Sequence, residues 1–523
     1  MNNNQNIYQQ QRPPQIGQPM MPPPMPPRGQ WQRRAMNAIG LVRGISFPKW
    51  LSQYGVVVYI LALAVVSLMY STYSLPWYYM LSGVLSIVVF FLYGSHLAER
   101  ISPIRMRRIK IFEQRIFLMA FTLRVIWMFL IYAIFMQNYG DSFGFENRDA
   151  MFYDEIGADV SNAIENGNLF EFLKETSGKI DVSDLGYGVY VGIIYRLTGN
   201  SLIAVRFLKC IWSSLIVLLI YRLAKRDFGE QTARIAALFV ALWPNFWYYC
   251  GTHLKETEMV FLAVLFVEQA DQMLRSRQFT AWKVVPVLLI AAAMFTFRTP
   301  LGLVALIALV FSVVMSSSRV VSWGKRIIVG FLAIVLVGAI AGNRLVEKSQ
   351  ELIEASKTNQ QTGINHYSTR KDASGNQQSF AKYAGSAVFA PMIFTLPFPS
   401  MVRPFEGQDV QQLLNGGNLI KNVMSFFTIF ALVMLLISGK WRDHLLPLSF
   451  MLGYLVVLAL SSFAHSERFH QPAMPFEFMF AAYGLSIAVT KPKYKRWFTY
   501  WAVLMFVAAI AWNWFKIKGR GLA

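Results

Sequence analysis

One short acidic segment holds the side chains of this chain that are best suited to chemistry. Residues 137–185 contain 11 acidic residues against 3 basic ones, whereas the whole protein carries a net charge of +21. The segment directly follows an apolar run, Ile116 to Met136, that is long enough to cross a bilayer. A carboxylate at such a place could act as a general base, and several together could bind a divalent cation.

Helical phasing separates one of these carboxylates from the others. A helical stripe is predicted for Asp149, Tyr153, Ile156, Val160 and Ala163, in a helix that ends at Gly167. On or near the opposite, solvent-facing side of this helix we expect Asp154, Ser161, Asn162 and Glu165. Asp149 is therefore expected to face membrane or protein, where it must be paired or hydrogen-bonded. The other interpretation is that Asp149 caps the start of the helix, a position that Asp also favours.

Cationic and aromatic side chains occur at positions where they could meet the same carboxylate. Lys255, Arg298 and Arg468 fall at the outer ends of apolar runs, where a cation would meet an anionic head group. Each of them could instead extend to the interface without a functional role. His253 and His470 lie near the same predicted face, and Tyr153 could orient the site or pack at the interface.

The elements that must position these residues are membrane-spanning helices. The chain has 523 residues, of which 55% are hydrophobic and 15% aromatic, and its apolar runs recur at lengths near that needed to cross a bilayer core of about 30 Å. These features predict an all-α polytopic membrane protein. The expected spans are 54–73, 76–96, 116–136, 201–221, 235–252, 257–274, 284–297, 300–316, 326–342, 422–438, 445–463, 473–489 and 497–515. The two short spans 284–297 and 300–316 are expected to be two tilted helices that meet at Arg298-Thr299-Pro300, and one broken element is the alternative.

The distribution of Lys and Arg predicts how the chain crosses the membrane. The basic residues lie in short loops between apolar runs, a pattern that sets topology in membrane proteins and argues against binding to nucleic acid. With the N-terminus inside, every basic loop is cytoplasmic except the C-terminal tail, and two large segments, 137–200 and 343–421, lie outside. Cys210 and Cys250 both lie in apolar runs, so neither a disulfide framework nor a zinc site is expected.

Four regions follow from this pattern. Residues 1–50 are expected to be a disordered Pro-, Gln- and Asn-rich tail followed by a basic cytoplasmic stretch. Residues 51–115 contain two additional transmembrane helices and a basic loop. Residues 116–490 form the main membrane domain, which includes both outer segments. Residues 491–523 contain a C-terminal transmembrane helix and tail.

Several motifs, in a fixed order along the chain, are similar to those of one enzyme family. They are Asp149-x-x-x-Tyr153, Gly186 to Gly199, Arg206, Leu238 to Pro244, Leu254-Lys255-Glu256-Thr257, Arg298-Thr299-Pro300 and Glu467 to Pro472. Together they resemble the GT-C fold glycosyltransferases, which include protein O-mannosyltransferases and the bacterial aminoarabinose transferases acting on lipid A. The resemblance covers about residues 116 to 490. It implies a bundle of about 11–13 transmembrane helices with extracytoplasmic interfacial helices.

The resemblance also implies a reaction, in which a sugar passes from a polyprenyl-phosphate donor to a lipid, glycan or protein acceptor with inversion. Asp149 is then the general base, and the substrate-binding residues are Tyr153, His253, Lys255, Arg298, Arg468 and His470. No cofactor is expected. Asp149 is followed by Ala150 and not by a second acid, so a divalent metal is possible but not favoured. The implied place is the inner or plasma membrane of a bacterium, with the site on the extracytoplasmic face and membrane lipids as neighbours.

Two other functions fit a protein with many spans. A polysaccharide polymerase or ligase would also have large outer loops, although such enzymes usually depend on loop arginines and histidines. A transporter or flippase would show paired broken helices in two matching halves, and the sequence contains no such internal repeat.

Overall fold

The computed structural model of the chain describes most of the predicted spans. The described residues are 47–103, 106, 108–177, 182–276, 281–317, 320, 321, 324, 392–404, 409–460 and 466–518. Within these ranges the protein is helical, and the only pairing of extended chain is an isolated antiparallel bridge between Ser74 and Val402. The predicted tail before residue 47, the span 326–342 and most of the outer segment 343–421 lie outside the described residues.

Most of residues 316–408 lies outside the described ranges, and within those ranges most successive helices are joined by short connections. Their bounds are α2 (Lys49–Met69), α3 (Trp77–Ile87), α4 (Gly94–Arg100), α5 (Ile109–Tyr139), α6 (Asn147–Glu165), α7 (Leu169–Thr176), α8 (Val182–Thr198), α9 (Leu202–Phe228), α10 (Glu230–Leu242), α11 (Pro244–Gly251), α12 (Glu256–Arg275), α13 (Ala281–Phe297), α14 (Thr299–Met315), α17 (Asp409–Leu413), α18 (Asn415–Ile437), α19 (Leu445–Ala459), α20 (Glu467–His470), α21 (Met474–Ala488) and α22 (Pro492–Lys518). A single π-helical turn, Val88–Tyr93, joins α3 to α4.

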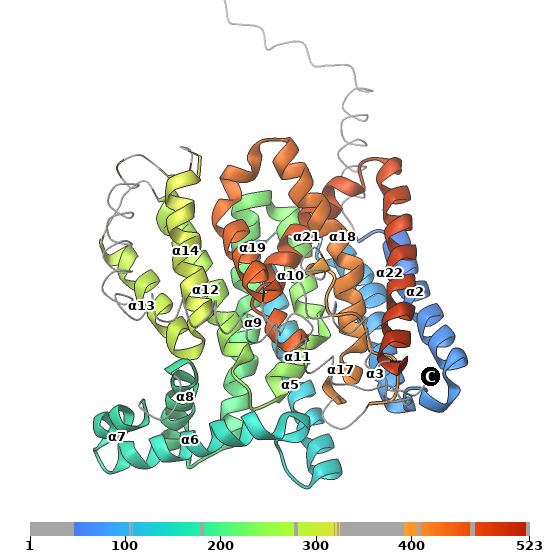
Figure 1. Ribbon diagram of the computed structural model, residues 1–523. Coiled ribbons are helices and arrows are strands. Elements are labelled where there is room, and N and C mark those ends of the chain that lie inside the picture. The colour runs from blue at the N-terminus through green and yellow to red at the C-terminus, as the bar shows by residue number, and fades with distance from the viewer. Residues whose placement is uncertain are drawn as a thin grey trace, which may run out of the picture. The chain divides into compact units, whose positions relative to one another are not determined.

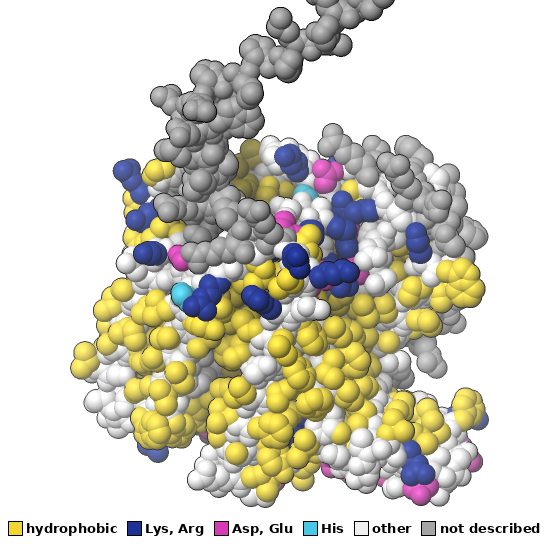
Figure 2. Space-filling view, turned by 180° about the vertical axis from the view of Figure 1, so that it is seen from behind, with side chains coloured by type: hydrophobic (Ala, Val, Ile, Leu, Met, Phe, Trp, Pro, Cys, Tyr) yellow, Lys and Arg dark blue, Asp and Glu magenta, His cyan; other side chains and the backbone are white. Residues whose placement is uncertain are grey.

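Seven helical stretches in the described ranges are long and apolar enough to cross a membrane, and three shorter apolar helices accompany them. This confirms the predicted all-α polytopic membrane protein. Hydrophobic side chains cover a broad middle belt of the surface, and Lys and Arg gather along one edge of that belt (Figure 2). The last turns of α9 and α12 carry basic residues, namely Lys225, Arg226 and Arg275.

The centre of the bundle is formed by α9, which packs against α5, α10 and α12, and by the pair α18 and α21. The extra helix α2 packs on α3 and on the C-terminal helix α22. At the end opposite the basic edge, α6 crosses the ends of the long helices, with α7 at its far end and α8 leading back into the bundle (Figure 1). The acidic segment therefore forms a helical platform at one end of the membrane bundle.

Glycines allow α6 and α8 of this platform to pack at close range. A Cβ atom at Gly188 would overlap the Ile156 side chain, and one at Gly192 would overlap Val160. The residues that fill these gaps, Ile156 and Val160, belong to the stripe predicted for α6, and both are buried. The stripe thus packs on α8, and this contact fixes the orientation of α6 above the bundle.

One predicted span differs from the observed helices, and the prediction of two helices around Arg298 is confirmed. The span 235–252 is two helices, because Pro244 cannot continue the hydrogen bonding of α10 and the preceding Trp243 is extended. Around Arg298 the chain forms two helices, α13 and α14, that pack against each other, so the interpretation as one broken element is wrong. Arg298 is itself extended, with φ −164° and ψ 108°, and forms the turn between them.

Candidate active site

Asp149 lies in the first turn of α6, where a carboxylate is favoured by the helix dipole. The stripe predicted below it is confirmed, since Tyr153, Ile156, Val160 and Ala163 are all buried. Asp149 itself differs from the expectation, because its side chain is 54% exposed. It is the first member of the stripe, in the first turn of the helix, so its side chain projects past the packed surface.

Two further expectations about α6 are wrong. The helix begins at Asn147, two residues before Asp149, so Asp149 is inside the first turn and is not the cap. Ser161 is buried and not on the solvent-facing side, because it directly follows Val160 at the edge of the packed stripe. Asp154 accepts a hydrogen bond from the Tyr195 hydroxyl of α8 and therefore helps to join the two helices.

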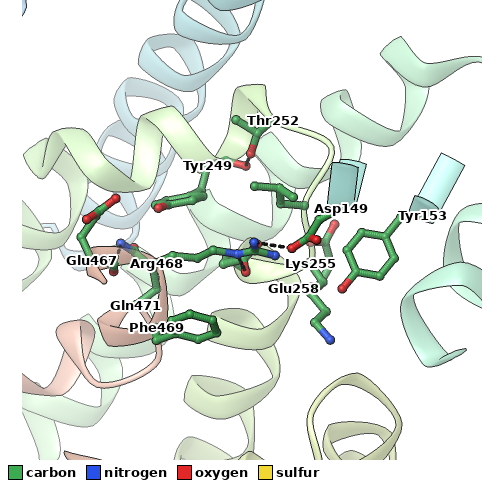
Figure 3. A network of polar contacts seen from close by, with 12 residues as sticks. Asp149, Tyr153, Tyr249, Thr252, Lys255, Glu258, Glu467, Arg468, Phe469 and Gln471 are labelled. Atoms are coloured by element: carbon green, nitrogen blue, oxygen red, sulfur yellow. Dashed lines mark hydrogen bonds and ion pairs between the residues drawn. The ribbon is translucent and has the colours of Figure 1, made fainter. Parts of the chain in front are cut away.

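Arg468 joins Asp149 to the bundle. Its Nη1 atom donates to Asp149 Oδ2 at 2.6 Å, and its Nε atom donates to Glu256 Oε1 at the start of α12. The Glu256 side chain is only 1% exposed, whereas that of Asp149 is half exposed. Figure 3 shows the Arg468 side chain reaching from α20 to Asp149, with Tyr153 beyond the carboxylate. One guanidinium thus bridges a buried carboxylate and an accessible one.

Lys255 forms a second ion pair next to the first. Its ammonium donates to the Ser183 carbonyl at 2.9 Å and to the Asp184 carboxylate, and Asp184 also accepts from the Tyr153 hydroxyl at 2.8 Å. Burial lowers the pKa of Lys255, and the neighbouring Asp184 opposes that shift. Burial and then Asp184 raise the pKa of Tyr153, which keeps its hydroxyl protonated as the donor. Lys255 and Tyr153 therefore tie α12 and α6 to the start of α8.

Arg298 contributes a cation of a different kind. Its Cζ atom lies 4.1 Å from the centre of the Phe469 ring, and the Arg468 Cζ atom lies 5.8 Å from the same ring centre. Among the described residues, the Arg298 guanidinium forms no ion pair with a carboxylate. Two guanidiniums therefore share one aromatic ring, and one of them has donors available for an anion.

The two histidines are buried behind this surface. His253 packs between the rings of Tyr187 and Tyr195, and burial followed by the nearby Lys209 lowers its pKa well below the ordinary value. His470 Nδ1 lies 2.6 Å from the buried Lys421 ammonium. Neither ring is accessible to a substrate arriving from water in this structure. The contacts of His253 and His470 support a structural role in the turns that carry them. The predicted binding of substrate by these two histidines stays a prediction.

Sequence reasoning missed two acids that complete the site. Glu256 lies in the motif Leu254-Lys255-Glu256-Thr257 but has no predicted role, and Asp184 is one of the 11 acids of residues 137–185 without a role of its own. Each is the partner of a predicted cation, Arg468 and Lys255 respectively. The available signal for Glu256 was its place at the outer end of a predicted span, directly after the cation Lys255, whereas no comparable signal marked Asp184. No group of three or more His, Cys, Asp and Glu side chains suited to a metal ion occurs in the part of the chain that the structure describes.

Comparison with known proteins gives one match. Residues 187–341 match the family model described as dolichyl-phosphate-mannose-protein mannosyltransferase. No curated protein and no solved structure matches the chain. The match confirms the resemblance predicted from the motifs and supports a membrane glycosyltransferase of GT-C type. It covers Lys255, Glu256 and Arg298, whereas Asp149 and Arg468 lie outside the matched residues.

Proposed function

We propose that this membrane glycosyltransferase transfers a sugar from a polyprenyl-phosphate donor to a lipid, glycan or protein acceptor, with inversion and with Asp149 as the general base. The match to a mannosyltransferase family makes mannose the first sugar to test. One observation carries the proposal. Arg468 forms an ion pair with the accessible carboxylate of Asp149, and it shares the Phe469 ring with a second guanidinium, that of Arg298, which suits a phosphate.

The accessibility of Asp149 distinguishes it from the other acids of the site. Glu256 also contacts Arg468 but is buried, and Asp184 is bonded to both Lys255 and Tyr153. Asp149 keeps an exposed side chain with one oxygen bonded to Arg468. The remaining lone pairs can accept a proton from an acceptor hydroxyl or amine that approaches from water.

The proposed reaction has one displacement step. The acceptor oxygen or nitrogen attacks the anomeric carbon of the donor sugar on the face opposite the phosphate, and the bond between that carbon and the phosphate oxygen breaks. The acceptor proton passes to Asp149. The bonding electrons leave with the polyprenyl phosphate, which gains a negative charge. A base on one side and cations on the other are therefore required.

Arg298 and Arg468 are suited to the phosphate side of this reaction. Arg298 has no carboxylate partner among the described residues, so its donors can meet phosphate oxygens without breaking an ion pair. Arg468 can add a second contact while Glu256 continues to hold its Nε atom. Guanidiniums bind phosphate with charge-assisted hydrogen bonds. These cations supply the positive charge that a divalent metal would otherwise provide, and on this basis we propose that transfer is independent of metal.

The place of the site in the bundle agrees with a lipid-linked donor. The α6 platform lies at the end opposite the edge where Lys and Arg gather (Figures 1 and 2). Since Lys and Arg mark the cytoplasmic side of membrane proteins, we propose that the platform is extracytoplasmic. The polyprenyl chain would remain in the bilayer while its phosphate reaches Arg298 at the α13–α14 turn.

The test is transfer by the variant Asp149→Asn in membranes, with dolichyl-phosphate-linked radiolabelled mannose as donor. The matched control is Glu155→Gln, which neutralises another exposed carboxylate on the same helix. We expect the transfer rate of Asp149→Asn to be about 100- to 10,000-fold below that of the wild type, as is typical for removal of a general base. Glu155→Gln should transfer at the wild-type rate. Equal transfer by the two variants would reject Asp149 as the base. No donor-dependent transfer by the wild type with any polyprenyl-phosphate sugar would reject the enzyme.

A further inference from the structure

A buried lysine on α9 lies behind the candidate site and has no part in the proposed reaction. Lys209 is 0% exposed and occupies the third turn of a membrane-spanning helix. An ammonium group in such a place must be paired and hydrogen-bonded, because its removal from water is costly. The partners of the Lys209 ammonium group therefore indicate its role in the protein.

The hydrogen-bond and ion-pair partners of Lys209 belong to the turn between α11 and α12 and to the first turn of α12. Its Nζ atom donates to the Thr252 carbonyl at 2.9 Å and to the Leu254 carbonyl, two groups that the turn leaves outside helical hydrogen bonding. The same atom lies 3.7 Å from Glu258 Oε2 in the first turn of α12. A single ammonium thus fixes both the backbone of the turn and the helix that follows it.

This turn carries two residues of the candidate site. Lys255 directly follows Leu254, and Glu256 begins α12 and holds Arg468. The path from Lys209 to Asp149 therefore runs through the turn to Glu256, then to Arg468 and on to the carboxylate. A shift of the turn would move the Arg468 guanidinium and with it the base.

We propose that Lys209 is a positioning residue for the sugar-transfer site, acting by holding the 252–255 turn through its two backbone carbonyls. The inference rests on the proposed function for its kinetic consequence. Its structural consequence, an ordered turn, does not depend on that function. Glu258 serves as the counter-charge that makes a buried lysine tolerable at this position, so the ion pair and the carbonyl contacts have different roles.

Two variants separate these roles. Lys209→Met removes both the charge and the carbonyl contacts and leaves Glu258 as a buried carboxylate without its partner. Lys209→Met combined with Glu258→Gln also removes the carboxylate charge, so the protein should accumulate as the wild type does. The carbonyls of Thr252 and Leu254 remain without their donor in both variants. The control is Lys225→Met, which removes a cation about 24 Å away at the other end of the same helix.

The kinetic readout is the transfer of mannose by the double variant. We expect kcat to fall about tenfold to 100-fold with KM for the donor within about threefold, the pattern of a displaced reacting group. Lys225→Met should keep both values. Wild-type kcat in the double variant would overturn the proposal, because Lys209 would then matter only as the partner of Glu258.

The structural readout is hydrogen–deuterium exchange of the backbone amides of residues 252–256. Exchange in this segment should be at least about tenfold faster in the double variant and unchanged in Lys225→Met, since loss of local contacts lowers the cost of local opening. Unchanged exchange in the double variant would overturn the proposal. This readout holds even if the wild type shows no transfer, so failure of the proposed function and failure of this inference give different results.

Discussion

The bridging role of Arg468 gives a prediction in which stability and activity separate. Arg468→Gln breaks two ion pairs of very different surroundings. The Glu256 carboxylate is 1% exposed and would remain buried without its cation, at a cost of about 3–5 kcal/mol. The Asp149 carboxylate is half exposed to solvent, so loss of this pair costs only about 0–1 kcal/mol. Most of the stability loss should therefore come from Glu256.

A second change tests this assignment. In Arg468→Gln combined with Glu256→Gln, the buried charge is removed together with its partner, so most of the lost stability should return. Transfer should not return, because neither variant has the guanidinium that holds Asp149 and meets the phosphate. We expect kcat about 100- to 1000-fold below the wild type in both, as for removal of one preorganised charge stabiliser.

The measurements are the midpoint of thermal unfolding of the purified protein in detergent and the rate of mannose transfer. The expected order of stability is wild type, then the double variant, then Arg468→Gln. A double variant no more stable than the single one would refute the argument about Glu256. Transfer within about threefold of the wild type in either variant would refute the role of Arg468 in the reaction.

Three further predictions follow from other contacts of the site. Arg298→Gln should raise KM for the donor about 10- to 100-fold with a smaller change in kcat, because a charge-assisted contact to phosphate is lost; unchanged KM would exclude this contact. Tyr153→Phe removes one hydrogen bond to Asp184, while Lys255 keeps the other. Stability should fall by about 0.5–1.5 kcal/mol and transfer should stay within about threefold, so a large loss of transfer would mean that the hydroxyl has a chemical role. Burial raises the pKa of Glu467, so the folded state binds its proton more tightly and loses stability as the pH rises above the ordinary value of 4.5. Glu467→Gln should therefore be more stable than the wild type at pH 7 and no more stable at pH 4, as thermal midpoints at both pH values would show.

The sequence predicted the elements of the site better than their pairing. The period of α6 identified Tyr153, Ile156 and Val160 as a buried stripe, because a helix packed on one face must repeat apolar residues every three or four positions. The same period placed Asp149 on this stripe, but it could not show that the packing against α8 ends before that residue. Asp149 is exposed because it lies where α6 extends beyond its contact with α8.

The ion pair of Asp149 with Arg468 could not be predicted from local sequence patterns. Asp149 and Arg468 are 319 positions apart in the chain, and α20, which carries Arg468, has only four residues. Their contact depends on how α19 and α12 hold α20, which no local pattern encodes. The contacts of Lys209 could not be predicted from the local sequence either. This residue lies within an apolar run, and the carbonyls that accept its hydrogen bonds belong to a turn more than 40 residues away.

The central claim is that Asp149 takes the acceptor proton and does not merely bind the donor. The most direct test is the rate of a single turnover, in which purified wild-type protein and Asp149→Asn are first saturated with dolichyl-phosphate-linked mannose and then mixed with acceptor-bearing membranes. We expect the two proteins to have equal donor affinity, within about threefold, and the variant to have a single-turnover rate about 100- to 10,000-fold lower. A variant that transfers at the wild-type rate once the donor is bound would contradict this claim.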